Sequence, residues 1–226
     1  MALSATINQP ISSTPPWQVL VVCTGNLCRS PMTEYLAVAA LRANLGTEVH
    51  SVTVSSAGTH ARNGMPMHRH AAAVLAERGI NPAGFAARRL DGTMVSDACL
   101  VLCAGREHRS FVVAMAPKAV RRTFTLREFA RLTAGIASTG IPAHTGQANP
   151  CPAETIRADG VRTCGDALVA HAADHRGRLR PEHPTDDDIA DPIGASIEAF
   201  RSCAEQISAA LAQPLALLTR AVQMNT

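Results

Sequence analysis

Short apolar runs that alternate with helical patterns constrain the fold of this 226-residue chain more than any other feature. The first run, Val-Leu-Val-Val within Gln18–Cys23, has the continuous apolar character of strands buried in parallel sheets. A helical pattern begins near Ser30, with Pro31 at the first helical position and Glu34 in the first turn. This order of strand and helix predicts an open α/β sheet with helices on both faces.

The same alternation continues along the chain. We expect three further strands, over Val49–Val54, Ala98–Cys103 and Arg121–Thr125, and a loop over Ser56–Thr59. Helical spacing of apolar residues predicts helices over Met67–Arg78, Glu107–Met115, Leu126–Leu132 and Ser196–Leu218.

The regular pattern fails in the second half of the chain. We therefore expect a single domain over residues 17–218 that carries an inserted arm or long loop over about 135–184, with one helix at Asp166–Ala173. Residues 1–16 are rich in Ser, Thr and Pro and are predicted to be a disordered lead, and residues 219–226 a tail.

Composition excludes several classes of protein. A formal charge of +3 gives no reason to expect a nucleic-acid partner, and the chain has no run of about 18 apolar residues that would predict a membrane span. Its first residues lack the basic start and apolar run of a secretory signal. Seven cysteines, an odd number, are scattered through a chain too long for a disulfide scaffold. These features predict a cytoplasmic protein with reduced thiols.

The turn between the first strand and the first helix carries the clearest chemical signal. Residues 23–30 read Cys-Thr-Gly-Asn-Leu-Cys-Arg-Ser, so that Cys23 and Arg29 stand at the two ends of one loop. A Cys and an Arg at this spacing are common by chance, but the preceding strand, Gly25 and the helix start at Ser30 make an anion-binding loop the better interpretation. Backbone N–H groups in such a loop converge on one point, and the helix N-terminus adds positive potential.

Phosphoryl transfer to sulfur needs a thiolate and a guanidinium on opposite sides of one turn. Arg29 can hold two equatorial phosphate oxygens while Cys23 attacks in line, and the positive field favours the thiolate form. Ser30 is expected to donate a hydrogen bond to the thiolate, and Asn26 to brace the loop. The expected phosphate-binding residues are Thr24, Gly25, Asn26, Leu27, Cys28 and Ser30.

Residues 22–34 resemble the signature of the low-molecular-weight protein tyrosine phosphatases. That family carries the loop Cys-x-Gly-Asn-x-Cys-Arg-Ser-Pro, and this chain matches every fixed position. Ser56–Thr59 is similar to the family's Ser-Ala-Gly loop, and the resemblance extends over residues 18–134 and 185–212. It implies a four-stranded parallel sheet in the order 2-1-3-4, a flavodoxin-like arrangement of the phosphotyrosine phosphatase I type.

The resemblance also implies a general acid, which the family takes from an Asp-Pro pair before the last helix. Here that pair is Asp191-Pro192, and Asp191 is the expected acid because a leaving alkoxide or phenolate needs a proton. The adjacent carboxylates, Asp186–Asp188, have two readings: they keep the acid protonated, or they decorate the surface.

The implied reaction is the hydrolysis of phosphomonoesters, protein phosphotyrosine first among them, through a phosphocysteine intermediate. Cys23 attacks phosphorus, Arg29 and the loop amides stabilise the equatorial oxygens, and Asp191 protonates the leaving group and then activates water. Arginine and backbone dipoles supply the charge, so neither a metal nor an organic cofactor is expected. Expected partners are a phosphorylated protein or small phosphomonoester and phosphate, with no nucleic acid and no membrane. The oligomeric state is left open.

Two departures from the family leave the preference for tyrosine open. Relatives that act on phosphotyrosine wall the ring with aromatic side chains after the Ser-Ala-Gly loop and after Asp-Pro. This chain has His60, Ala61 and Arg62 at the first place and Ile193 and Gly194 at the second.

Cysteine chemistry offers further hypotheses. Cys28 in the loop is implied by the resemblance to trap oxidised Cys23 as a disulfide, although a small buried filler at the helix start is an equally simple role. Arsenate reduction, which some relatives perform, needs two more cysteines, and only Cys103, with Cys99 nearby on the strand, is available. A phospho-ligand-binding module without activity is the third alternative, and it would be expected to lack the nucleophile or the acid.

Overall fold

The computed structural model of the chain describes residues 15–138 and 156–223. In this part of the chain, four strands form one parallel sheet in the order β2-β1-β3-β4, which confirms the predicted topology. The strands are β1 (Trp17–Cys23), β2 (Val52–Gly58), β3 (Leu100–Cys103) and β4 (Thr123–Thr125). The α-helices are α1 (Arg29–Leu45), α2 (Arg69–Glu77), α3 (Gly92–Asp97), α4 (Arg106–Met115), α5 (Leu126–Thr133), α6 (Ile156–His175) and α7 (Ile197–Gln223). Short 3-10 helices are η1 (Gly46–Ser51), η2 (Pro117–Arg122), η3 (Ala134–Ser138) and η4 (Pro184–Asp187).

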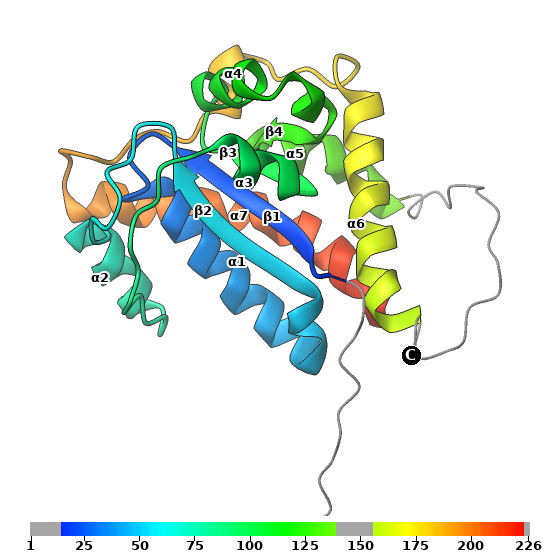
Figure 1. The fold of residues 1–226 in the computed structure, drawn as a ribbon, viewed down its shortest axis with the longest axis horizontal. Helices are drawn as coiled ribbons and strands as arrows, with labels where there is room; N and C mark the ends of the chain where they lie inside the picture. Colours follow the sequence, from blue (N-terminus) through cyan, green and yellow to red (C-terminus); the bar gives the residue numbers. More distant parts are fainter. Residues whose placement is uncertain (1–14, 139–155, 224–226) are drawn as a thin grey trace, which may run out of the picture.

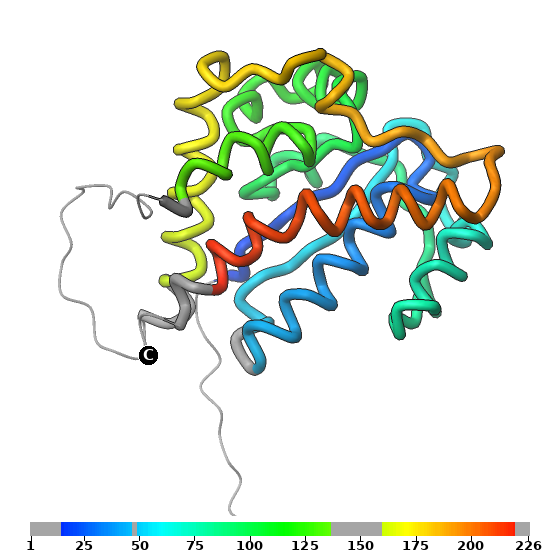
Figure 2. Tube along the Cα trace, turned by 180° about the vertical axis from the view of Figure 1, so that it is seen from behind, coloured from blue at the N-terminus to red at the C-terminus, as the bar shows by residue number. Residues whose placement is uncertain are grey.

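Helices cover both faces of the sheet, because successive side chains of each strand point to opposite sides. Val19 and Val21 of β1 join an apolar cluster with α1, α5, α6 and α7, whereas Leu20 and Val22 join a second cluster with α3 and α4. Figure 1 shows the sheet with α3 and α4 on one side, and Figure 2, from behind, shows α7 running beside α1 across the other. No helix in the described residues combines the length and apolarity that a membrane crossing requires.

The carboxyl ends of the three longer strands lie together at one edge of the sheet. Cys23 is in register with Gly58 of β2, and Val22 with Cys103 of β3. Open α/β sheets bind ligands at this edge, so the loop after β1 occupies the position where a site is expected.

The second strand lies further along the chain than predicted. Residues 46–51 form the 3-10 helix η1, and β2 begins only at Val52, in register with Trp17, and ends at Gly58. The predicted strand over Val49–Val54 and loop over Ser56–Thr59 were therefore wrong in their boundaries. Pairing along the whole of β1 extends β2 through polar Ser55 and Ser56, whose sequence resembles a loop.

A large part of the predicted arm is a helix of the core. Helix α6 is longer than the predicted Asp166–Ala173, and its side chains Val161, Cys164, Leu168 and Ala172 are buried in the same cluster as β1 and α7. In Figure 1, α6 runs alongside the start of β1. Residues 156–175 are thus a packed helix and not a long loop, and residues 139–155 lie outside the described residues.

Trp17 and Gly165 explain how α6 fits against the sheet. A Cβ atom built on Gly165 would lie 2.4 Å from the Trp17 ring, so only glycine admits the indole at this distance. The indole Nε1 also donates a hydrogen bond of 2.9 Å to the Asp166 carboxylate, and Trp17 is only 3% exposed.

The predicted lead and tail are only partly within the described residues. Residues 1–14 and 224–226 lie outside them, whereas α7 continues to Gln223 with Leu217, Leu218 and Thr219 buried. The predicted tail therefore begins as part of the last helix.

Candidate active site

The loop after β1 rests on the end of β2. Cys23 ends β1 and α1 begins at Arg29, so the N–H groups of the first helical turn lie next to the loop. A Cβ atom on Gly58 would lie 2.6 Å from the Thr24 carbonyl oxygen and 2.7 Å from the Asn26 nitrogen. Glycine is therefore required at the end of β2 so that the two backbones can approach.

Cys23 lies beside Ser30, as the sequence led us to expect. The two side-chain atoms, Sγ and Oγ, are 3.0 Å apart, and Cys23 is 3% exposed. The Ser30 hydroxyl also lies 3.3 Å from the Ala57 carbonyl oxygen, so its proton has a second acceptor. A thiolate at Cys23 would be the stronger acceptor of the two, because hydrogen bonds to charged groups are the stronger ones.

Asn26 joins the loop to its surroundings. Its backbone has a φ of 53°, in the left-handed region that Asn tolerates better than most residues, and its side chain is buried. The amide nitrogen donates to Ser30 Oγ (2.9 Å) and Ser56 Oγ (2.8 Å), and the amide oxygen accepts from the Arg88 backbone N–H (2.8 Å). Ser56 in turn donates to Glu34 Oε2 at 2.6 Å.

Glu34 ends this hydrogen-bonded chain from the loop. Burial raises the pKa of its carboxyl, while the hydrogen bond from Ser56 and the charge of Arg88 oppose that rise. The side chain comes from the second turn of α1, and it fixes Ser56 beneath the loop. The sequence pattern indicated Glu34 only as a residue near the helix start.

Arg29 and Asp191 meet at the open side of the loop. Arg29 Nη2 lies 2.6 Å from Asp191 Oδ2 and 3.4 Å from Thr24 Oγ1, and Nη1 donates to the Ile189 carbonyl oxygen at 3.3 Å. The Arg29 side chain is 7% exposed, whereas that of Asp191 is 40% exposed. The structure thus places the expected acid next to the expected phosphate-binding guanidinium.

The carboxylates before Asp191 anchor the segment that carries it. Asp188 accepts hydrogen bonds from the Arg106 backbone and guanidinium, and Asp187 pairs with Arg131 of α5 at 2.9 Å. Asp186 accepts from the His183 backbone N–H. Each of the three carboxylates thus binds a neighbouring group, so the acidic run is more than surface decoration.

Helix α4 fixes the same segment. The Ile189 backbone N–H donates to the Ala104 carbonyl oxygen at 2.8 Å, and Asp188 contacts the first turn of α4. Burial opposes ionisation of Asp188, but the hydrogen bonds from Arg106 hold the pKa of that carboxyl below its usual range. These contacts tie the segment that carries Asp191 to Ala104, the residue that follows β3, and to the start of α4.

The two regions that carry aromatic walls in relatives have other side chains here. The His60 ring contacts Phe111 of α4 edge-on, with ring centres 5.5 Å apart, and its Nδ1 lies 3.0 Å from Thr59 Oγ1. Ile193 after Asp191-Pro192 is 53% exposed. An imidazole and an exposed aliphatic side chain therefore occupy the expected wall positions, and Phe111 is an aromatic neighbour that the sequence pattern did not indicate.

Cys28, Cys99 and Cys103 are the other cysteines for which the sequence suggested a role. Burial raises the pKa of Cys28 to about 12, and it raises the pKa of Cys103, which is completely buried. Cys103 belongs to the apolar cluster with α3 and α4, whereas Cys99 packs against the cluster on the opposite face. The pair considered for arsenate reduction is thus divided between the two faces of the sheet.

Histidine pairs make ring contacts instead of a metal centre. His68 and His70 have ring centres 5.3 Å apart, and His171 and His175 stack at 3.9 Å. Within residues 15–138 and 156–223, no three His, Cys, Asp or Glu side chains are grouped to hold a metal ion.

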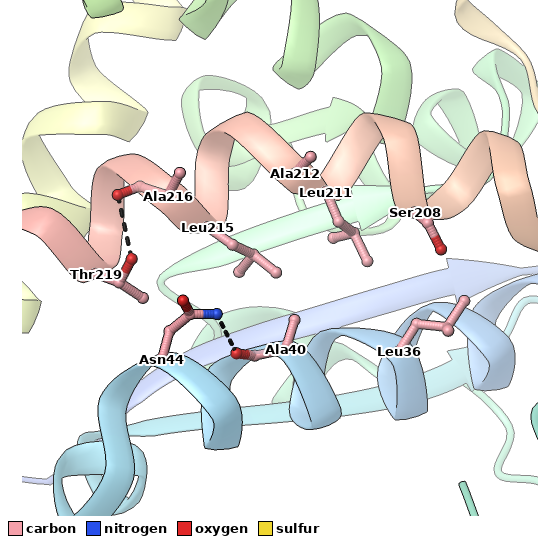
Figure 3. Close-up of a pocket in the computed structure, with 9 residues that line it drawn as sticks. All are labelled: Leu36, Ala40, Asn44, Ser208, Leu211, Ala212, Leu215, Ala216 and Thr219. Atoms are coloured by element: carbon pink, nitrogen blue, oxygen red, sulfur yellow. Dashed lines mark hydrogen bonds between the residues drawn. The ribbon is translucent and has the colours of Figure 1, made fainter. Parts of the chain in front are cut away.

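A groove of about 550 Å³ between α1 and α7 is not suited to this chemistry (Figure 3). Asn44 and Thr219, two of its polar residues, donate to carbonyl oxygens of their own helices. None of its lining residues is ionisable; they are Leu36, Ala40, Asn44, Ser208, Leu211, Ala212, Leu215, Ala216 and Thr219.

The fold and this loop define the class of cysteine-dependent phosphatases. A parallel sheet ends its central strand in a cysteine, an arginine opens the following helix, and a distant carboxylate reaches the same loop. The chain belongs to the low molecular weight phosphotyrosine protein phosphatase family, whose pattern matches residues 18–138. Members of this family are hydrolases that act on phosphorylated substrates.

Individual relatives agree with the family assignment. The chain is 38% identical over 120 residues to a protein-arginine-phosphatase from Geobacillus stearothermophilus, covering 53% of this chain and 76% of the relative. It is 38% identical over 105 residues to the low molecular weight protein-tyrosine-phosphatase Etp from Escherichia coli K12, covering 46% and 66%. The solved low molecular weight protein tyrosine phosphatase from T. tengcongensis is 26% identical, with a TM-score of 0.59 over 88% of this chain and 97% of that one.

Proposed function

We propose that this phosphatase uses Cys23 as its nucleophile, Arg29 as its phosphate-binding cation and Asp191 as its general acid and base. The observation that carries the proposal is the 2.6 Å contact between Arg29 and Asp191, groups 162 residues apart in sequence. It brings a proton donor to the loop whose opposite end holds Cys23 beside Ser30 at 3.0 Å. These are the groups that a phosphocysteine mechanism requires.

The reaction proceeds in two displacements. The Cys23 thiolate attacks phosphorus, and Asp191 donates its proton to the leaving oxygen as the P–O bond breaks. Arg29 and the loop amides stabilise the equatorial oxygens in both steps. Asp191, now a carboxylate, takes a proton from water, which attacks the phosphocysteine and releases phosphate.

The remaining loop residues support the nucleophile and the phosphate. Ser30 donates to the thiolate, Asn26 braces the turn through Ser56, and the backbone of Thr24, Gly25, Leu27 and Cys28 contributes amides toward the anion. We assign no metal or organic cofactor to the reaction.

The proposed substrate is a phosphorylated protein, with phosphotyrosine as the first candidate side chain. The similarity to a phosphotyrosine family supports that candidate. A second candidate, phosphoarginine, is favoured by the wall positions of His60 and Ile193, where no Phe, Tyr or Trp stands, and by the similarity to a protein-arginine-phosphatase. The two substrates can be distinguished because the nitrogen leaving group of phosphoarginine and the phenolic leaving group of phosphotyrosine differ in how much they need a proton from the acid.

The test is turnover of matched peptides that carry phosphotyrosine or phosphoarginine at one position. Phosphate release from either is measured with wild type, Cys23→Ser and Cys203→Ser, the last being a buried cysteine on α7 that serves as the matched control. We expect Cys23→Ser to abolish release of phosphate and Cys203→Ser to retain it. Release that persists in Cys23→Ser would contradict the assignment of the nucleophile.

Three further proposals follow from the cysteines and the chain layout. A Cys23–Cys28 disulfide is proposed as protection against oxidation, and the high pKa of Cys28 predicts that this disulfide closes slowly near neutral pH.

A cytoplasmic location is proposed from the scattered cysteines, six of which are free thiols in the described residues. One catalytic domain over residues 17–218, with an inserted segment at about 135–184 that follows the region matched by the family, is proposed as the domain layout.

A further inference from the structure

His108, in the first turn of α4, is a buried histidine that the proposed mechanism leaves unused. It is 2% exposed, and its Nε2 atom lies 2.8 Å from Thr24 Oγ1 in the anion-binding loop. Its other ring nitrogen, Nδ1, is also buried and has no partner with hydrogen-bond geometry among the described residues. The buried ring is held between Thr24 of the loop and the Gly105 backbone.

Thr24 joins this histidine to the guanidinium. Its hydroxyl oxygen accepts a hydrogen bond from Arg29 Nη2 at 3.4 Å and lies 2.8 Å from His108 Nε2. Thr24 directly follows the nucleophile, so the three side chains of Thr24, Arg29 and His108 form one connected row along the loop.

Charges from three elements act on the ring. Burial and the positive charge of Arg29 lower the pKa of His108, so the ring is neutral in the empty site near neutral pH. Glu107 and Asp191, together with the Gly105 carbonyl, oppose that shift, and Asp188 also interacts with His108. Glu107 Oε1 lies 3.3 Å from Nε2 on a side chain that is 75% exposed. Charges of both signs thus act on one ring, and the net effect is a lowered pKa.

We propose that His108 is a positioning residue for phosphoryl transfer, which orients the Thr24 hydroxyl beside Arg29 and takes up a proton when a tetrahedral dianion fills the loop. The proposal rests on the proposed function, since it assumes that the loop binds the transferred phosphate. The dianion adds negative charge next to Thr24, and an opposite charge at this range favours a protonated imidazole.

The hydrogen bonds change direction with the proton. We place the proton of the neutral ring on Nδ1, so that Nε2 accepts from the Thr24 hydroxyl, whose oxygen accepts from Arg29. When the ring takes a proton from solvent, Nε2–H donates to Thr24 Oγ1 instead. The Thr24 O–H is then free to donate to an oxygen of the anion, which adds a hydrogen bond to the occupied loop without moving the backbone.

The proposal is tested with inorganic sulfate, which stays a dianion over the whole pH range used and so adds no titration of its own. The background is Cys23→Ser, in which no thiolate titrates. Imidazole nitrogen signals of this protein are followed by NMR as the pH is changed, with and without sulfate, and His108→Gln assigns the His108 signals. We expect sulfate to raise the pKa of His108, and by linkage sulfate should bind roughly tenfold more tightly to the protonated ring.

Two variants separate the hydrogen bond from the charge. Glutamine at position 108 can reach Thr24 but cannot gain a proton, whereas His108→Phe loses both. We expect His108→Gln to bind sulfate with a flatter pH dependence than its parent, and His108→Phe to bind it roughly five- to tenfold more weakly at low pH. His171→Gln, a half-buried histidine on α6, is the matched control and should follow its parent.

In otherwise wild-type enzyme, a positioning role also predicts a split in kinetics. Relative to wild type, His108→Phe should have a higher KM and a lower kcat for an aryl phosphate. His108→Gln should have a kcat closer to that of wild type, but its KM should lack the wild-type dependence on pH. A His108 titration that sulfate leaves unchanged would overturn the proposal. The His108 signals can also be assigned from the backbone resonances of Cys23→Ser, so this outcome is measurable even if neither His108 variant folds. Failure of the proposed function has a different signature, because turnover would then persist in Cys23→Ser whatever His108 does.

Discussion

The guanidinium of Arg29 and the carboxylate of Asp191 lie 2.6 Å apart, so the cation proposed to bind phosphate is paired with the acid proposed to serve the leaving group. A phosphate dianion entering the loop must compete with Asp191 for Arg29. Asp191 is the more exposed partner and comes from a segment that follows η4, whereas Arg29 is buried at the start of α1. We therefore expect the carboxylate to give way and to turn toward the leaving oxygen.

Asp191→Asn should bind inorganic phosphate several-fold more tightly and turn over poor leaving groups far more slowly. The tighter binding follows from removing a negative charge that competes for Arg29. Loss of the proton donor should lower kcat by about 10²- to 10⁴-fold for alkyl-like leaving groups and much less for an activated aryl phosphate. Product inhibition and a leaving-group series measure the two effects, with Asp97→Asn, exposed at the end of α3, as the control. An equal loss of kcat across the series would show that Asp191 is not the acid.

Ser30→Ala should slow the reaction of Cys23 at a fixed pH near neutral. The Ser30 hydroxyl lies 3.0 Å from Sγ, and a hydrogen bond to a charged group contributes about 1.5–3 kcal/mol. We expect kcat to fall by at least about tenfold and iodoacetamide to alkylate Cys23 more slowly in the variant. Ser208→Ala, an exposed serine on α7, is the control. An alkylation rate of Ser30→Ala equal to that of wild type at this pH would mean that Ser30 does not support the thiolate.

Local sequence predicted the parts of the site that one turn of chain contains. Cys23, Arg29 and Ser30 follow directly from the strand, loop and helix pattern around them. Asp191 needed the resemblance to a family, because nothing local distinguishes an acid from an ordinary Asp-Pro turn. His108 could not be found from sequence, since its role depends on how α4 packs beside the loop.

The fold was predictable where apolar periodicity is strong. The order of the strands in the sheet followed from the family resemblance alone. The strand β2 was misplaced because Val49 belongs to a 3-10 helix and not to the strand. Helix α6 was mostly missed because its sequence is rich in Ala and Gly and shows little helical periodicity of large apolar residues. Its burial depends on close contact with Trp17, which only the folded chain shows.

Gly165→Ala tests whether α6 is part of the core. The added Cβ would lie 2.4 Å from the Trp17 ring, so helix or indole must shift, and we expect a loss of about 1–3 kcal/mol in the free energy of unfolding. Denaturant unfolding measures this loss. Gly92→Ala at the start of α3, where the new Cβ has open space, should not be destabilised. Equal stability of Gly165→Ala and wild type would show that α6 does not pack as described.

Glu34→Gln should change the pH dependence of stability with a definite sign. Burial raises the folded-state pKa of Glu34 above the ordinary value of 4.5, so the folded protein holds this proton more tightly than the unfolded chain. The stability that this preference contributes is present at low pH and is lost as pH rises through the folded pKa. The amide oxygen of the introduced glutamine accepts the Ser56 hydrogen bond without titrating. The free energy of unfolding of the variant, relative to wild type, should therefore increase from about pH 4 to about pH 8.

This prediction is checked by measuring the denaturant midpoints of Glu34→Gln and wild type from about pH 4 to about pH 8. A difference that stays constant with pH would contradict a raised pKa at Glu34. Glu205→Gln, an exposed residue on α7, is the control and should leave the profile unchanged.

The most direct test of the mechanism is to find the phosphoryl group on Cys23. Asp191→Ala is mixed with an activated aryl phosphate, quenched in acid within the first turnover, digested and analysed by mass spectrometry. We expect one added phosphoryl group on the peptide that contains Cys23, and none when Cys23 is also replaced by Ala. Burst release of the aryl alcohol with no phosphorylated Cys23 peptide would contradict the phosphocysteine mechanism.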